Sequence, residues 1–408
     1  MISVSQAEKI IFNNIRTFQT AVVPLTDAYG RVLHEDIKAD RPQPAFDKAL
    51  MDGIAISSRA WQKGIRKFTM EGIAPAGQAA RRLKHDDGCI QIMTGAVLSK
   101  DCDCVIPVEQ IMIKNNCAVV SAAAVVKPMQ NIRLIGADRK KGELLLRKGC
   151  QLLPPHIATA ASIGKSKLKV SAKPKVAIIS NGDELVDIDK KSIQPFQIRK
   201  SNSYALHPTF AQTGLCESKM FHFPDDKKIL LREIGKILVR FDILVLSGGV
   251  SMGEFDYIPQ VLKELGVQVL FHKVSQKPGR PFWFGKSRNG QPVFALPGNP
   301  VSTQICAYRY VVPYIRYAAG LNLTTPRVIL SEAKNDFIKK LKIPEGFTYF
   351  LPVKIRYHAN AQMEAIPVAI GGSGDYAALA QADGFVELGG EVKNIRKNLF
   401  VAFYSWNV

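Results

Sequence analysis

Apolar runs and helical periods alternate along the second half of this chain of 408 residues. Val176–Ser180, Asp242–Leu246 and Val293–Leu296 each read as a strand that is buried on both faces. Apolar positions at helical spacing follow Asp225 and recur from Tyr257. Strands that alternate with helices in this way predict a parallel, doubly wound α/β sheet.

The N-terminal stretch predicts helices followed by extended chain. Ser5 and Glu8 are spaced as a capping box in front of an apolar helical period, and a second short helix is expected over Thr26–Gly30. The prolines within Asp36–Pro44 exclude a helix and predict extended backbone. Residues 139–172 return to helix and short strand, and we expect them to pack against the N-terminal helices.

Two other stretches are rich in short strands. Residues 45–138 carry short apolar runs between glycines, and from about residue 325 short alternating runs continue to the end of the chain. The second pattern predicts a small β-barrel. The predicted fold is therefore multidomain α/β plus β, with an elongated, discontinuous N-terminal domain of residues 1–44 and 139–172, an inserted β-rich domain of residues 45–138, an α/β domain of residues 173–322 and a C-terminal β-barrel-like domain of residues 323–408.

Polar, glycine-rich loops follow three of the predicted strands. The carboxyl ends of parallel strands meet at one edge of a sheet, so we expect these loops to converge on a ligand. Glycine lets the backbone approach that ligand closely, and a helix that starts there attracts an anion. Two cations in a loop fixed by proline and glycine suit phosphate. The predicted binding residues are Ser180, Gly182, Asp183, Ser247, Gly248, Gly249, Ser251, Lys277, Arg280, Pro297, Gly298, Asn299 and Pro300.

Charge and composition limit the classes of binding partner and the cellular compartment that we expect. The net charge is +20, but the lysines are scattered and no nucleic-acid motif accompanies them, so the charge favours a solvated surface that steers anionic ligands. No apolar run approaches the ~20 residues of a membrane span, and no signal peptide is apparent at the N-terminus. Seven cysteines without a Cys-x-x-Cys pair favour a reducing compartment. We expect a cytoplasmic protein that binds neither nucleic acid nor membrane, and Cys102 and Cys104 are expected to be packing residues in a strand.

Eight short motifs occur along the chain in a fixed order. They are Met51-Asp52-Gly53; Thr94-Gly95-Ala96 with Asp103 and Glu109; Asn131-Ile132-Arg133 with Gly136-Ala137-Asp138; Asn181-Gly182-Asp183-Glu184; Ser201-Asn202-Ser203; Ser247 to Asp256; Lys277-Pro278-Gly279-Arg280; and Leu296-Pro297-Gly298-Asn299-Pro300. In this order they resemble the MoeA family of molybdopterin molybdenumtransferases, whose eukaryotic relatives include the gephyrin C-terminal region. The resemblance covers essentially the whole chain.

The resemblance implies a chemistry and a set of site residues. It implies that molybdenum is transferred from molybdate into adenylylated molybdopterin, with Mg²⁺, and that AMP is released. It also implies a homodimer whose cleft lies between the α/β domain of one subunit and the second domain of the other. The residues carried over are Asp52, Thr94 and Asp138 as catalytic residues and Ser373 as a residue that handles molybdate. Glu184 and Asp256 end adjacent loops, and because carboxylates hold Mg²⁺, we expect them to be catalytic residues and ligands of that ion.

Other interpretations of the sequence stay open. A molybdopterin adenylyltransferase shares the glycine loop but would lack the first, second and fourth domains. A non-catalytic molybdopterin-binding or scaffold protein would lose the carboxylates, whereas Glu184 and Asp256 are present. One departure from the family pattern is Lys200, which stands where an aspartate usually precedes the Ser-Asn pair. Further candidate partners are the adenylyltransferase that supplies the substrate and the molybdoenzymes that accept the product.

Overall fold

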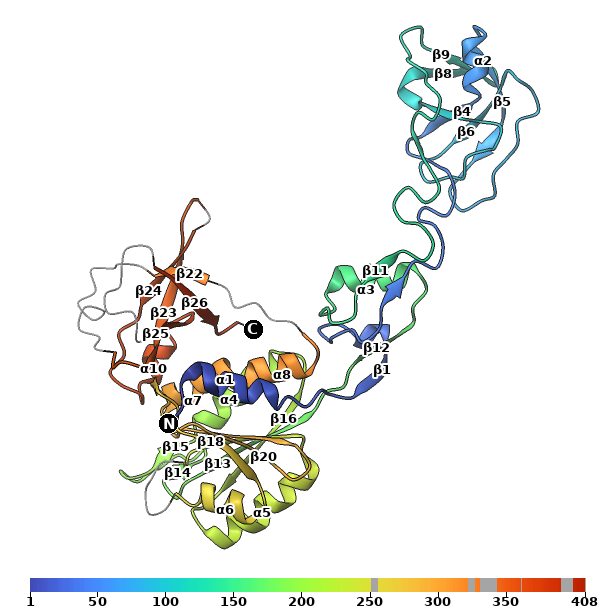
Figure 1. The fold of residues 1–408 in the computed structure, drawn as a ribbon. Helices are drawn as coiled ribbons and strands as arrows, with labels where there is room; N and C mark the ends of the chain where they lie inside the picture. The colour runs from blue at the N-terminus through green and yellow to red at the C-terminus, as the bar shows by residue number, and fades with distance from the viewer. Residues whose placement is uncertain (251–255, 322–326, 331–342, 361, 390–398, 408) are drawn as a thin grey trace. The chain divides into compact units, whose positions relative to one another are not determined.

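The computed structural model describes residues 1–250, 256–321, 327–330, 343–360, 362–389 and 399–407. The chain divides into two compact units (Figure 1). Unit 1 comprises residues 1–35, 148–157 and 166–408, and unit 2 comprises residues 36–147 and 158–165. Unit 2 is therefore an insertion, since the chain leaves unit 1 and later returns to it.

The α/β part of unit 1 is built on a six-stranded sheet. In sheet order the strands are β16 (Glu217–Phe223), β13 (Lys175–Asn181), β17 (Ile243–Ser247), β21 (Pro292–Leu296), β20 (Trp283–Lys286) and β18 (Gln268–His272). The first four are parallel, but β20 is antiparallel to both of its neighbours. The prediction of a parallel sheet is wrong at this edge. The connection 287–291 is too short for a parallel crossover, which needs about a dozen residues.

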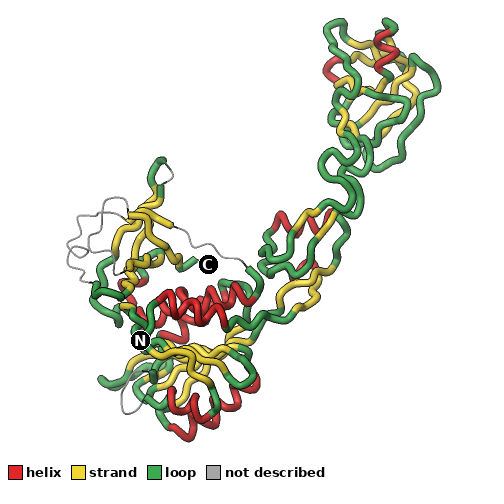
Figure 2. The backbone as a smooth tube through the Cα atoms, viewed as in Figure 1, coloured by secondary structure: helices red, strands yellow, loops and turns green. Residues whose placement is uncertain are grey.

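Helices cover both faces of this sheet (Figures 1 and 2). On one face lie α5 (Lys227–Arg240) and α6 (Ile258–Glu264), and on the other lie α1 (Val4–Asn13), α4 (Asn202–Ala211), α7 (Pro300–Cys306), the π-helix η3 (Ala307–Val311) and α8 (Val312–Ala318). Ala7 and Ile11 of α1 belong to the same buried cluster as Val176 and Ile178 of β13. The first helix is therefore part of the α/β core, although the sequence assigned it to a separate N-terminal domain.

The N-terminal segment departs from the sequence prediction in two places. Ser3, not Ser5, caps α1: its hydroxyl accepts from the Gln6 N–H at 3.2 Å, and the Gln6 side chain accepts from the Ser3 N–H at 2.9 Å. Ser5 lies inside the helix, whereas Ser3 has the extended backbone that an N-cap requires. The helix expected over Thr26–Gly30 is only a single 3₁₀ turn, η1 (Leu25–Asp27).

The segment that returns from unit 2 pairs with strands. In unit 1, β12 (Lys167–Ser171) is antiparallel to β1 (Thr20–Pro24). In unit 2, β11 (Leu144–Leu146) is antiparallel to β2 (Ile37–Lys38). Helix α3 (Pro154–Ser162) lies between them in the sequence. The expectation that this segment packs on the N-terminal helices is therefore wrong, because its β-strands use their backbone groups to pair with other strands.

Unit 2 is β-rich, as predicted. Its six-stranded sheet has the order β7 (Cys104–Pro107), β4 (Gly53–Ile56), β6 (Gly88–Ile92), β5 (Lys67–Ala74), β9 (Cys117–Val120) and β8 (Ile111–Lys114), and its smaller elements are β3 (Lys48–Ala49), paired with β10 (Ile132–Arg133), α2 (Ser58–Gln62) and η2 (Val108–Gln110). Two buried clusters pack within the unit. Cys104 lies in β7 as expected, whereas Cys102 is buried in the turn before it.

The C-terminal part of unit 1 is a five-stranded barrel. Its strands are β23 (Thr348–Tyr357), β24 (Met363–Pro367), β22 (Arg327–Leu330), β26 (Leu399–Ser405) and β25 (Gly384–Gly389), and the ring closes because β23 pairs with both β24 and β25. Helix α10 (Tyr376–Leu379) starts at Asp375, whose carboxylate accepts from the Ala378 N–H at 3.0 Å. Strand β19 (Gln276–Lys277) adds to β23 in parallel. Within the described ranges, no helix is long and apolar enough to cross a membrane.

Candidate functional site

The loops after β13, β17 and β21 converge on one cavity of about 250 Å³. Ser180 and Asn181 come from the end of β13, Ser247 and Gly248 from the end of β17, and residues 298–300 from the loop after β21. The parallel register places Ser180 beside Ser247, and Ser247 beside Leu296. The cavity thus lies at the carboxyl edge of the parallel strands, where open α/β sheets bind ligands.

Glycine is required where these loops approach one another. A Cβ on Gly298 would lie 3.4 Å from the Cα of Gly248, whose φ is +101°. A Cβ on Gly249, at φ +66°, would lie 2.7 Å from both Asn181 Nδ2 and Ile258 Cγ1. The Ser-Gly-Gly sequence therefore combines a left-handed backbone with close contact to β13 and α6.

Asn202, at the start of α4, ties the loops together. Its amide nitrogen donates to Ser247 Oγ at 2.8 Å and to the Gly298 carbonyl at 2.7 Å. The Tyr376 hydroxyl of α10 donates to its amide oxygen at 3.4 Å. Close by, the Asn299 amide donates to Ser373 Oγ at 2.7 Å. Residues 373 and 376 of the C-terminal part of the chain therefore reach the same sheet edge.

A two-stranded ribbon and an ion pair form another wall of the cavity. Strand β14 (Leu185–Val186) pairs in parallel with β15 (Ile198–Arg199). After these strands, Lys200 Nζ donates to Asp187 Oδ2 at 2.6 Å, and the Tyr204 hydroxyl donates to Oδ1 at 2.8 Å. The Lys200 and Tyr204 hydrogen bonds lower the pKa of Asp187 to about 2. Asp187 is therefore ionised at neutral pH, and it holds the ammonium of Lys200 at the cavity wall.

Unit 2 holds the other three predicted catalytic residues. The Thr94 backbone N–H and hydroxyl donate to the same oxygen of Asp52, at 2.6 and 2.7 Å. These bonds, the hydroxyl first, lower the pKa of Asp52. Asp138 accepts from the guanidinium of Arg133. All three predicted residues are exposed, which leaves their polar groups within reach of solvent or a ligand.

Three family models match the chain in order. The MoeA N-terminal region (domain I and II) matches residues 2–164, the "Probable molybdopterin binding domain" matches residues 177–317, and the MoeA C-terminal region (domain IV) matches residues 337–406. Over 407 residues, the chain is 35% identical to the molybdopterin molybdenumtransferase of Synechocystis sp., with 100% of both chains covered. The chain belongs to the MoeA family.

Other members of the family are similar to this chain in sequence or structure over nearly their whole length. The molybdopterin molybdenumtransferase of Haemophilus influenzae is 32% identical over 400 residues, which cover 95% of this chain and 94% of that protein. The crystal structure of the molybdopterin biosynthesis MoeA protein from Pyrococcus horikosii matches with a TM-score of 0.81 and 28% identity, covering 100% of this chain and 99% of that one. The MoeA fold therefore extends over the whole chain.

The predicted binding residues of this MoeA chain are not all at the cavity. Those that line it are Ser180, Glu184, Ser247, Gly248, Gly298, Asn299 and Pro300, whereas Gly182, Asp183, Gly249, Asp256, Lys277, Arg280, Pro297 and Ser373 are not lining residues. Ser251 lies outside the described residues. The loop of Lys277 and Arg280 is bonded to Gln276, whose amide donates to the Gly279 carbonyl at 3.1 Å, and both cationic side chains are exposed.

Sequence reasoning passed over four polar residues at this MoeA edge. Asn181 and Asn202 belong to sequence motifs and Lys200 departs from the family pattern, but these signals do not assign any of the three to the site. His222 carried no signal, because only the parallel pairing of β13 with β16 brings its Nδ1 within 3.2 Å of Ser180 Oγ. Burial, and then the charge of Lys200, lowers the pKa of His222, so its ring is neutral at neutral pH.

The carboxylates of the MoeA site suit Mg²⁺ that is shared with a substrate. Glu184 lines the cavity, and its carboxylate lies so close to Gly182 that an added Cβ there would be 2.5 Å from Oε2. Asp256 is half-buried just before α6. Among the described residues, no three His, Cys, Asp or Glu side chains cluster as a metal site. Mg²⁺ commonly takes one or two carboxylates and completes its shell with phosphate oxygens and water, so Glu184 at the cavity fits that mode as one carboxylate ligand.

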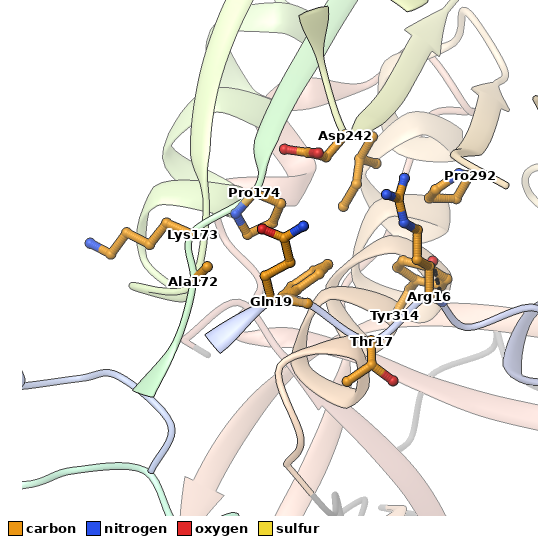
Figure 3. A pocket seen from close by; sticks show the side chains of 11 residues that line it. Arg16, Thr17, Gln19, Ala172, Lys173, Pro174, Asp242, Pro292 and Tyr314 are labelled. Carbon is orange, nitrogen blue, oxygen red and sulfur yellow. Dashed lines mark hydrogen bonds between the residues drawn. The ribbon is translucent and has the colours of Figure 1, made fainter. Parts of the chain in front are cut away.

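A second cavity of about 180 Å³ opens at the opposite, amino edge of the same sheet (Figure 3). Arg16, Gln19 and Asp242 surround it, and the Tyr314 hydroxyl accepts from the Arg16 backbone N–H at 3.0 Å. None of the predicted site residues lines it. The carboxyl edge therefore remains the candidate active site of this MoeA chain.

Proposed function

We propose that this chain transfers molybdenum from molybdate into adenylylated molybdopterin and releases AMP. The observation that carries the proposal is the full-length match to molybdopterin molybdenumtransferases, combined with a cavity at the carboxyl edge of the α/β sheet. Both substrates are oxyanions. Hydroxyls, amides and close-approaching backbone around the cavity offer the hydrogen-bond donors that oxyanions require.

Five of the predicted residues take a stated role toward Mg²⁺ or the substrate anions in this proposal. Glu184 and Asp256 would hold Mg²⁺ together with the substrate phosphates, and the bound ion would neutralise charge on the leaving phosphate. Lys277 and Arg280 would contact the anionic ends of the substrates. Ser373, held beside Asn299, would handle molybdate. A non-catalytic binding protein would need the glycine loops but not the two carboxylates.

We also propose that the chain works as a homodimer. The family resemblance implies that Asp52, Thr94 and Asp138 act in a cleft that two subunits share. Thr94 and Arg133 would supply hydrogen-bond donors to that cleft. Thr94 already donates to Asp52, and Arg133 already donates to Asp138. Candidate transient partners are the adenylyltransferase that supplies the substrate and the cytoplasmic molybdoenzymes that accept the cofactor.

The test combines the purified protein with adenylylated molybdopterin, molybdate and Mg²⁺. AMP release is followed directly, and cofactor formation is followed by activation of a molybdenum-free molybdoenzyme. Glu184→Gln and Asp256→Asn should each lower AMP release by roughly 100-fold, because positioning Mg²⁺ contributes several kcal/mol to transition-state stabilisation. Asp86→Asn is the matched control, since Asp86 is an exposed carboxylate of unit 2 in a surface ion pair with Lys63. Full activity in both site variants would show that neither carboxylate positions Mg²⁺, whereas no AMP release by the unsubstituted protein would favour a non-catalytic binding protein.

A further inference from the structure

Lys200 is a positively charged and largely buried residue in the wall of the cavity. Two of the residues that line the cavity carry a positive charge, Arg199 and Lys200. Arg199 is exposed, and its guanidinium donates to the Lys190 carbonyl at 3.0 Å. The side chain of Lys200 is only 13% exposed. Lys277 and Arg280, the cations expected to bind phosphate, do not line this cavity.

The ammonium of Lys200 is fixed by Asp187 but keeps N–H donors that Asp187 does not occupy. Asp187 Oδ2 accepts from it at 2.6 Å, and the Tyr204 hydroxyl fixes the other carboxylate oxygen at 2.8 Å. The Lys200 backbone N–H donates to the Val186 carbonyl at 2.9 Å, which fixes the start of the side chain. An ammonium carries three N–H donors. Among the described residues, the hydrogen-bond and ion-pair partner of the Lys200 ammonium is Asp187. Two donors are therefore left for a ligand.

The field of Lys200 already reaches the neighbouring strand ends. After burial, its charge is the second cause that lowers the pKa of His222, and His222 contacts Ser180 Oγ at 3.2 Å. The side chain of Lys200 is only 13% exposed, so its charge lies in the cavity wall and not in bulk solvent. A positive charge in a partly desolvated wall attracts an anion more strongly than an exposed lysine does.

We propose that Lys200 binds a phosphate oxygen of the pterin nucleotide in this cavity and so contributes to substrate specificity. The inference rests on the proposed function, because that function supplies the phosphate. The charge of Lys200 makes this contact, and the ion pair with Asp187 contributes little to binding because Asp187 is half exposed. The alternative is a purely structural ion pair between β14 and β15, in which either partner could be removed with the same result.

Calorimetric titration with adenylylated molybdopterin separates the two interpretations. Lys200→Met should raise Kd at least about 10-fold, the lower end for a charge-assisted hydrogen bond. Lys200→Arg should recover most of the affinity. Asp187→Asn breaks the same ion pair but keeps the cation, so its Kd should stay within about 3-fold of the parent, as expected for a partly exposed pair. Lys173→Met is the control for charge, because Lys173 is an exposed lysine beside the other cavity.

Each outcome decides the proposal. Equal losses in Lys200→Met and Asp187→Asn would show that only the ion pair matters, and an unchanged Kd in Lys200→Met would remove Lys200 from the site. Thermal unfolding of both variants checks that they fold alike. AMP release by the unsubstituted protein is measured first. If that protein is active while Lys200→Met binds normally, the inference fails and the proposed function stands; if the unsubstituted protein is inactive, both fail.

Discussion

At the scale of single residues, the two hydrogen bonds from Thr94 to Asp52 give a titration that can be measured. Thr94→Val should raise the pKa of Asp52, because the hydroxyl is the first cause that lowers it. Thr94→Ser should keep the low value. NMR titration of the Asp52 carboxyl carbon makes the comparison, and an unchanged pKa in Thr94→Val would show that the backbone N–H alone sets it.

The sign of the accompanying stability effect follows from linkage. Asp52 has a folded pKa below its unfolded value, so its hydrogen bonds stabilise the fold above the unfolded pKa. That contribution disappears as the pH falls through the folded pKa. The stability difference between Thr94→Val and the parent protein should therefore be larger at neutral pH than in acid. Urea unfolding at the two pH values tests this.

The sequence identified site residues only where a motif set their position relative to a strand or helix. The Ser247-Gly248-Gly249 loop was assigned correctly to the carboxyl end of a strand, because strand, turn and helix periods lie next to each other in the chain. His222 could not be found in this way, since its contact with Ser180 depends on which strands pair. Lys200 was visible only as a charge in an unexpected place.

At the scale of secondary-structure elements, Arg309 of the π-helix joins three of them. Its guanidinium makes two hydrogen bonds to Glu8 of α1, at 3.0 and 3.1 Å, and one to Glu387 of β25 at 2.9 Å. Its side chain is only 5% exposed. The N-terminal helix, the α/β layer and the barrel therefore meet at one buried cation.

Removing this cation should destabilise unit 1 strongly. Arg309→Met should cost about 3 kcal/mol, the lower end for breaking a buried ion pair, because Glu8 keeps some access to water. Lys63→Met is the control, since it breaks a surface pair with Asp86 and should cost less than about 1 kcal/mol. Urea unfolding monitored by tryptophan fluorescence gives both values. Equal losses would mean that the buried network adds nothing to the fold.

The elements themselves were predicted unevenly. Buried strands such as β13 and β17 were found because a short unbroken apolar run that ends in a polar turn is typical of a strand covered on both faces. Strand β20 was missed, and with it the antiparallel edge, because Trp283–Lys286 directly follows the Pro/Gly loop and has no helix before it. Helix α1 was predicted, but it packs on the α/β sheet and not in a separate N-terminal domain. The apolar face of a helix does not identify the sheet that covers it.

At the scale of the whole molecule, the proposed homodimer has a decisive experiment. Light scattering should give about twice the 45.0 kDa of one chain, as expected for a closed two-fold assembly. Two inactive variants, Asp52→Asn and Glu184→Gln, are then unfolded, mixed in equal amounts and refolded. If the two residues serve a site shared between subunits, random pairing restores about a quarter of the parent activity. A mixture that stays inactive, from variants that refold, would place both residues in sites within one subunit.

The insertion of unit 2 into unit 1 also sets an order of events during protein synthesis. Helix α1 is made before unit 2, but Val176 and Phe294, which share its buried cluster, are made after it. At typical ribosome speeds, the face of Ile11 waits roughly 10–60 s for these strands. The six-stranded sheet of unit 2 lies between residues 53 and 120, so it can close its own core during this interval. A nascent chain halted near residue 170 would therefore carry a folded middle and an N-terminal helix with nothing yet to cover it.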